Sequence, residues 1–112
     1  MEDCIFCKIA NGKVPAKKLG EDDHCVAFPD LNPQAPFHAL VIPKLHVASL
    51  NDVRDPTLMG HLYAMAGQIA RANGFDQSGW RAVINTGPDA QQTVFHLHLH
   101  VIAKRKMTWP PG

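Results

Sequence analysis

The chain has 112 residues, a formal net charge of +1 with neutral histidine, and 46% hydrophobic residues. This length supports a single domain, which we expect to span residues 1–112. The balanced charge argues against a basic surface for nucleic acid. No apolar run reaches the roughly 20 residues that span a bilayer, and the first residues lack a signal-peptide pattern, so we expect no membrane partner. The three cysteines are an odd number for a disulfide scaffold, which favours a reducing, cytoplasmic location.

The first half of the chain contains signals for one short helix and three strands. The helix is expected over residues 3–10, with Asp3 as its N-cap and Asn11-Gly12 at its end. Strands are expected over residues 16–21, 24–28 and 37–43. A segment rich in proline and asparagine, residues 30–36, must be a loop between the second and third strands.

The second half contains signals for a long helix and two strands. Asp55 as N-cap, Pro56 in the first turn and Asn73-Gly74 at the end delimit a helix with one apolar stripe. Strands are expected over residues 80–85 and 94–103, with a loop over residues 86–92 between them. The tail Trp109-Pro110-Pro111-Gly112 can pair with no central strand, because proline lacks the N–H donor. This order predicts an α+β fold with a mainly antiparallel sheet.

Near the end of the chain, three histidines alternate with apolar residues, in the order His96, Leu97, His98, Leu99, His100 and Val101. On a strand, alternate side chains share a face, so the three imidazoles would lie together. Some of them must be neutral near pH 7, because three adjacent positive charges repel one another. A neutral imidazole is a metal ligand, a general base or a nucleophile. The alternatives are a solvated polar face and a plain metal-binding platform.

The segment from His96 to Ile102 resembles the signature of the histidine-triad (HIT) family. The resemblance covers most of the chain and includes these further motifs: Ile5-Phe6, Phe28, Asp30-Leu31, Pro33-Gln34-Ala35-Pro36, Val41-Ile42-Pro43-Lys44, His46, Gly60-His61-Leu62, Asn85-Thr86-Gly87, Gln92-Thr93-Val94 and Trp109-Pro110-Pro111-Gly112. They are similar to the Hint branch, of the purine nucleoside phosphoramidase type. The resemblance implies the HIT α+β fold, with about five antiparallel strands, one long and one short helix, and a two-fold homodimer. Helix 55–73 and the sheet edge beside residues 80–85 would form the dimer surface.

The resemblance also implies an activity and residues that perform it. The protein would hydrolyse nucleoside 5′-phosphoramidates or acyl-nucleotides to purine nucleoside monophosphates, with no cofactor needed for the chemistry. His98 would attack the α-phosphorus and form a nucleotidyl-histidine that water hydrolyses. His100, Thr93 and Asn85 would donate hydrogen bonds to the phosphate, assisted by backbone N–H groups near Thr93 and Val94. The alternatives are a dinucleoside polyphosphate hydrolase, as in the Fhit branch, and a nucleotide- or zinc-binding adaptor with negligible turnover.

For the nucleoside, the resemblance assigns Asp30 to the ribose hydroxyls, because two carboxylate oxygens can accept from both. The alternative for Asp30 is an Asx turn at the start of the loop. The apolar slot for the base would consist of residues that otherwise resemble core residues: Phe6, Ile9, Phe28, Leu31 and Ile42.

Three further positions near the nucleotide follow from the resemblance. Gln92 belongs to the motif that contacts the phosphate. Gln91 stands where Hint proteins often carry glycine, so its side chain either restricts the loop or adds a hydrogen-bond donor there. Trp109 would line the leaving-group side of the partner subunit's cavity, and the alternative is a frayed terminus.

Cys4 and Cys7 are three residues apart on the first helix and therefore share a face. This spacing is compatible with a redox pair, half of a zinc site or two buried thiols. The resemblance implies a structural zinc ion held with His46 and His96 in a closed Cys2His2 set. The remaining cysteine and histidines lack a partner pattern and are expected to be structural: Cys25, His24, His38 and His61.

Overall fold

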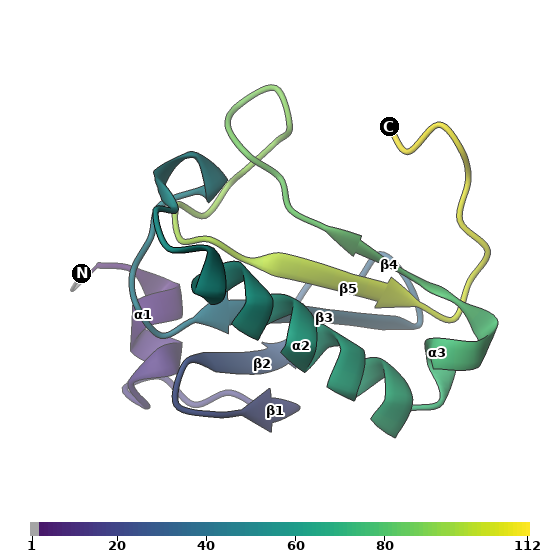
Figure 1. Cartoon of the computed structure of the whole chain (residues 1–112), viewed down its shortest axis with the longest axis horizontal. Helices are drawn as coiled ribbons and strands as arrows, with labels where there is room; N and C mark the ends of the chain where they lie inside the picture. Colours follow the sequence, from purple (N-terminus) through teal and green to yellow (C-terminus); the bar gives the residue numbers. More distant parts are fainter. Residues whose placement is uncertain (1–2) are drawn as a thin grey trace.

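The structure, a computed structural model, describes residues 3–112. The prediction of no signal peptide concerns a segment that includes Met1 and Glu2, and these two residues lie outside the described residues. Five antiparallel strands form one sheet in the order β1-β2-β3-β5-β4 (Figure 1). Their bounds are β1 (Gly20–Glu21), β2 (Cys25–Pro29), β3 (Phe37–Pro43), β4 (Trp80–Val83) and β5 (Leu99–Ala103). The predicted α+β fold with a five-stranded antiparallel sheet is confirmed.

The long helix α2 (Pro56–Ala72) covers one face of the sheet (Figure 1). Asp55 caps it by accepting a hydrogen bond from the Thr57 N–H, and Pro56 occupies the first turn, as the sequence predicts. Its apolar stripe packs on the inward-facing residues of β2, β3 and β5, which include Ala27, Val41, Leu99 and Val101. Within residues 3–112, no helix combines the length and the apolar character needed to cross a bilayer.

The short helix α1 (Ile5–Ala10) lies on the opposite face of the sheet. A second core forms there from Phe6, Ile9, Val26, Phe28, Leu40 and Ile42. The expected N-cap, Asp3, is wrong: Cys4 has the extended N-cap conformation, and its Sγ accepts from the Cys7 N–H at 3.4 Å. The thiol that caps the helix is thereby directed toward the second cysteine.

Several element boundaries differ from the expected ones. The first strand is reduced to Gly20–Glu21, because Val14 and Ala16 pack against the α1 core instead of joining the sheet. Two short elements were not expected, a 3-10 helix η1 (Leu50–Asp52) and the helix α3 (Phe75–Ser78). Helix α3 buries Phe75 against the ring of Phe37, with 4.7 Å between the ring centroids. That burial depends on a tertiary contact and leaves little local signal.

The strand that carries the histidines begins at Leu99, not at residue 94 as expected. Leu99 pairs with Val41, so Pro43 would come opposite Leu97, but proline has no N–H to donate. Before Leu99 the chain instead forms hydrogen bonds outside the β3–β5 ladder. Leu97 N–H donates to the Val47 carbonyl at 2.7 Å, and the His96 ring donates to the Pro43 carbonyl. His96 and His98 therefore precede the ladder, and only His100 lies within β5.

Candidate active site

A cavity of about 520 Å³ opens on the sheet face opposite α2, between α1, the end of β2 and the loop before β5. Ten of the residues predicted to bind the nucleotide line it: Phe6, Ile9, Phe28, Asp30, Leu31, Asn85, Thr93, Val94, His98 and His100. Its apolar end is formed by α1 and β2, and its polar end by the histidines and the β4–β5 loop. This division suits a molecule with a flat apolar part and an anionic part.

Three residues predicted to bind the nucleotide do not line the cavity: Ile42, Gln92 and Trp109. Ile42 is fully buried in the core behind Phe28, because its strand position points it into the α1 packing. The carboxamide of Gln92 is buried and donates to the carbonyls of Ala48 and Val94, while its oxygen accepts from the Gly87 N–H. Gln92 therefore fastens the loop, and its side chain has no donor left for a phosphate.

Trp109 does not line the cavity of its own chain. Its side chain is 82% exposed, and the tail extends away from the sheet (Figure 1). The expectation for Trp109 concerns the cavity of a partner subunit, so it stays a prediction.

His98 lies at the floor of the cavity with 7% of its surface exposed. Its Nδ1 donates to the backbone carbonyl of His96 at 2.7 Å. In the neutral ring this bond leaves a lone pair on Nε2, the nitrogen on the other side of the imidazole. The ring of Phe6 packs edge-on against His98, with 5.2 Å between centroids, and restricts its rotation. A nucleophilic nitrogen is thereby held in one tautomer and one orientation.

His100 is oriented by His38, which the sequence analysis had left as a structural residue. Gln34 N–H donates to His38 Nδ1 at 2.9 Å, so the proton of the neutral ring is on Nε2. That Nε2 lies 2.8 Å from His100 Nδ1 and donates to it. His100 then carries its own proton on Nε2, where it is available to a phosphate oxygen. The His96 carbonyl thus leaves His98 Nε2 as an acceptor, and the relay through His38 leaves His100 Nε2 as a donor.

The pKa values agree with this assignment of neutral rings. Burial lowers the pKa of His100 to about 4, and the charges of His98 and His38 act in the same direction. Burial also lowers the pKa of His38, against the opposing effect of Asp30. The contact of 3.4 Å between His38 Nε2 and Asp30 Oδ2 therefore joins a neutral ring to a carboxylate.

Asp30 forms the Asx turn that was one of its two expected roles, and its contact with the ribose stays a prediction. Its Oδ1 accepts from the Asn32 N–H at 2.8 Å, which is an Asx turn. Its Oδ2 faces His38 at the wall of the cavity and keeps lone pairs for a further donor, although only 18% of the side chain is exposed. Asp30, His38 and His100 offer ligand atoms within 4.8 Å of one another, but the bond between the two rings makes them a relay.

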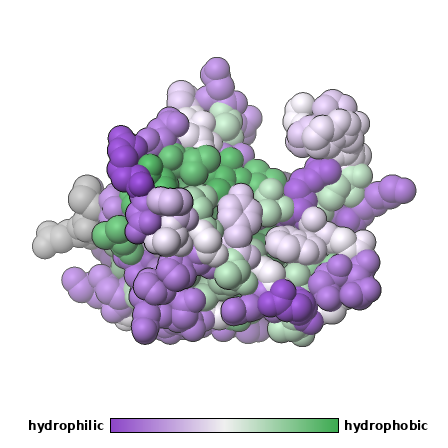
Figure 2. Space-filling view, in the orientation of Figure 1, coloured by the Kyte–Doolittle hydropathy of each residue, from purple (hydrophilic) through white to green (hydrophobic). Residues whose placement is uncertain are grey.

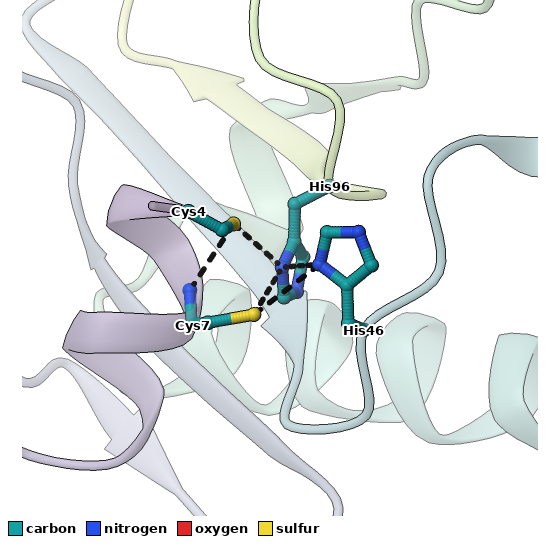
Figure 3. A group of neighbouring side chains, drawn as sticks. All are labelled: Cys4, Cys7, His46 and His96. Atoms are coloured by element: carbon teal, nitrogen blue, oxygen red, sulfur yellow. Dashed lines mark hydrogen bonds between the residues drawn. The ribbon is translucent and has the colours of Figure 1, made fainter. Parts of the chain in front are cut away.

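Cys4, Cys7, His46 and His96 converge behind the cavity (Figure 3). His96 is fully buried, and its Nε2 donates to the Pro43 carbonyl at 2.8 Å, which leaves the Nδ1 lone pair directed at the thiols. Burial lowers the pKa of His96 and so favours this neutral form. Burial raises the pKa of the Cys7 thiol. The thiol is therefore protonated near neutral pH unless a cation beside it stabilises the thiolate.

The distances within this cluster match a tetrahedral site. His96 Nδ1 lies 3.4 Å from Cys4 Sγ and 3.5 Å from Cys7 Sγ, and 3.2 Å from His46 Nδ1. Around a tetrahedral zinc ion, nitrogen and sulfur ligands are about 3.6 Å apart and two nitrogens about 3.4 Å. The four residues therefore fit zinc in ligand type and spacing, and His96 fits it in tautomer as well. All four positions of the ion would be filled by protein.

Comparison with known proteins places the chain among relatives that share these features. The model of the HIT domain family matches residues 11–107. The chain belongs to the HIT domain family. Protein pkiA of Dictyostelium discoideum is 47% identical to this HIT protein, over 98% of the chain and 90% of the relative.

Solved structures agree with the family assignment. A HIT family hydrolase from Legionella pneumophila has a TM-score of 0.94 and 46% identity, covering 98% of this chain and all of that one. A zinc-bound histidine triad family protein from Mycobacterium smegmatis has a TM-score of 0.84 and 39% identity, covering 93% of this chain and 76% of that one. The fold is therefore that of the HIT family over almost the whole chain.

The residue that sequence reasoning missed is His38. Within strand 37–43 it alternates onto the same face as Leu40 and Ile42, and a polar ring on an apolar face needs a hydrogen-bond partner. That alternation was the available signal. The identity of the partner, His100 on β5, depends on the pairing of β3 with β5.

Proposed function

We propose that this HIT protein hydrolyses nucleoside 5′-phosphoramidates, or the related acyl-nucleotides, to purine nucleoside monophosphates. The observation that carries the proposal is the arrangement of His98 and His100, with a bare Nε2 beside an N–H donor in one cavity. Displacement at phosphorus needs both a nucleophile and donors for the phosphate oxygens.

In the proposed reaction, His98 Nε2 forms a bond to the α-phosphorus and the P–N bond to the amine breaks. The amine leaves with a proton taken from solvent, and the nucleotide remains on His98. Water then forms the new P–O bond and returns a proton to solvent, the bond from phosphorus to His98 Nε2 breaks, and the nucleoside monophosphate departs. His100, Thr93 and Asn85 line the same end of the cavity, so we assign them to the phosphate oxygens, where charge redistributes in both steps.

The other end of the cavity is assigned to the nucleoside. Phe6, Ile9 and Phe28 offer apolar walls, and Phe6 and Phe28 meet edge to face with 5.6 Å between centroids. Leu31 is fully exposed at the rim, a position that a base would cover. Asp30 is assigned to the ribose hydroxyls through the lone pairs that the Asx turn and His38 leave free.

A structural zinc ion held by Cys4, Cys7, His46 and His96 belongs to the proposal. Zinc would tie α1 to the segments that carry the two histidines and so support the wall formed by Phe6. It would supply no chemistry at phosphorus, because four protein ligands leave no open position. None of the three cysteines is in a disulfide, which is in keeping with the proposed cytoplasmic location.

We further propose a two-fold homodimer formed through α2 and β4. β4 is one of the two edge strands of the sheet, and its four residues are all half-buried. Hydrophobic surface gathers below the projecting β4–β5 loop, on this side of the molecule (Figure 2). An unpaired edge with apolar surface beside it favours a self-complementary contact. In such a dimer, each Trp109 would reach the partner subunit's cavity.

The deciding experiment compares three compounds: adenosine and guanosine 5′-phosphoramidates and a diadenosine polyphosphate. We expect turnover of the phosphoramidates and a His98 nucleotidyl adduct detected by mass spectrometry after rapid quenching. Preferential turnover of the diadenosine compound would favour the polyphosphate hydrolase instead. Nucleotide binding without an adduct in a single-turnover assay would favour a nucleotide-binding adaptor with negligible turnover.

A further inference from the structure

Gln91 has a backbone conformation that its residue type disfavours. Its φ is +63°, in the left-handed region that glycine adopts without a steric penalty. The conformation is held by a tight turn, because the Gln91 N–H donates to the Pro88 carbonyl at 3.0 Å. A left-handed residue other than glycine costs conformational free energy, and such residues concentrate at functional sites. The side chain at position 91 therefore calls for a functional reason.

The loop around Gln91 is held in place by the side chain of the neighbouring Gln92 and not by the side chain of Gln91. Gln92 uses its buried carboxamide for three hydrogen bonds, to Ala48, Val94 and Gly87. Among residues 3–112, the carboxamide of Gln91 has no hydrogen-bond partner, and the residue is exposed. The hydrogen-bonded loop thus exposes the carboxamide of Gln91, whose N–H donors and carbonyl acceptor are all available to a ligand.

Gln91 stands at the rim of the cavity whose floor is His98. Both residues line that cavity, together with Asn85 and Thr93 at its polar end, but His98 is buried and Gln91 exposed. In an in-line displacement the leaving group departs on the side opposite the nucleophile. With His98 at the floor, the leaving group faces the rim, where Gln91 is presented.

We propose that the carboxamide of Gln91 binds the leaving group of the substrate and makes the enzyme selective for leaving groups that carry their own amide or carboxylate. This inference rests on the proposed function and extends it from the nucleotide to the departing part of the substrate. The amide can donate to a carbonyl or carboxylate oxygen and accept from an amide N–H, whereas a plain alkyl group offers it neither.

The test measures binding of intact substrates to the His98→Ala variant, in which no turnover disturbs the measurement. Two adenosine 5′-phosphoramidates are compared, one with alaninamide and one with propylamine as the amine. Adding Gln91→Gly should weaken binding of the alaninamide compound about fivefold relative to the propylamine compound, the contribution of one neutral hydrogen bond. Gln91→Glu should disfavour an alanine compound with a free carboxylate by at least the same factor, because the two negative charges repel.

Lys104 offers a matched control: among the residues that the structure describes, it is the other non-glycine residue with a positive φ, at +69°, and it does not line the cavity. Lys104→Gly makes the same backbone exchange and should leave the ratio of the two affinities unchanged. An unchanged ratio in Gln91→Gly, in a protein whose wild type forms the His98 adduct, overturns the role of Gln91 alone. Absence of both binding and adduct with the wild type overturns the proposed function and this inference together.

Discussion

The Nδ1 of His98 donates to the backbone carbonyl of His96 at 2.7 Å, while the ring of His96 directs its own Nδ1 at Cys4 and Cys7. His96 thus orients the proposed nucleophile with its backbone and completes the proposed metal site with its side chain. Phe6, between the two cysteines in sequence, packs on both His96 and His98. The Cys2His2 cluster and the cavity therefore share a wall, although none of the four cluster residues lines the cavity.

Replacement of His98 by alanine should lower kcat/KM for an adenosine phosphoramidate by at least about 10³-fold, since it removes the group that forms the covalent intermediate. Binding of the nucleoside monophosphate should remain, because Asp30 and the apolar end of the cavity are untouched. The measurements are steady-state kinetics and calorimetric titration with the product nucleotide. Activity within tenfold of the wild type contradicts the mechanism, and an adduct on another histidine contradicts the assignment.

Replacement of His38 by alanine should lower kcat about 10- to 100-fold with a smaller change in KM, because His100 loses the donor that fixes its tautomer. His38→Gln retains an amide N–H that can donate to His100 Nδ1 and should recover activity to within about tenfold of the wild type. Kinetics of the two variants at equal folded fraction, checked by circular dichroism, give the comparison. If the glutamine variant is as slow as the alanine variant, the donor role of His38 is wrong.

Protein prepared without chelator should contain about one zinc ion per chain, and removal of the ion should lower Tm by about 10 °C or more. Because the site is closed, its loss should act first on stability and only through it on turnover. Metal analysis and thermal unfolding with and without chelator provide the measurements. Cys7→Ser should lose the metal, whereas the control Cys25→Ala, in the core outside the cluster, should retain it. Less than a tenth of an equivalent of any metal would leave the cluster as two buried thiols beside two histidines.

Deletion of residues 109–112 should change the preference among leaving amines while the preference between adenosine and guanosine stays the same. The exposed Trp109 contributes nothing to the cavity of its own chain, so any effect must come through a partner subunit. The measurement is the ratio of kcat/KM for two amines on the same nucleoside phosphoramidate, in protein shown to be dimeric by light scattering. An unchanged ratio would make the tail a frayed terminus.

Stability should fall as the pH drops from about 6.5 to about 4. The pKa of His100 is lowered from 6.5 to about 4 in the folded chain, so in this window the unfolded chain binds a proton that the folded chain does not. The contribution of His100 to the free energy of unfolding is therefore complete above pH 6.5. It is lost as the pH falls to about 4, and the loss is at most about 3 kcal/mol. Urea unfolding at several pH values measures the slope, and His100→Gln should reduce it. An equal slope in the variant would assign the pH dependence to other groups.

Local signals in the sequence were sufficient for the long helix, for the approximate positions of the five strands and for the shared face of the histidines. The caps of α2, its apolar stripe and the breaker-rich loop at residues 30–36 depend on neighbours within a few positions, so they can be recognised without a structure. The alternation of the three histidines likewise predicts that they share a face, whether or not the ladder includes them. The roles proposed for His98, Asp30 and the Cys2His2 set came from family resemblance.

Tertiary structure alone decided which of these side chains remain available for a ligand. Ile42 and Gln92 were predicted to contact the nucleotide, but one is enclosed by the α1 core and the other uses its amide within the loop. His38 acquires its role because the register of β3 against β5 places it beside His100. Hydrogen-bond partners far apart in sequence are chosen by strand order and register, which depend on the packing of the whole chain and not on any one segment.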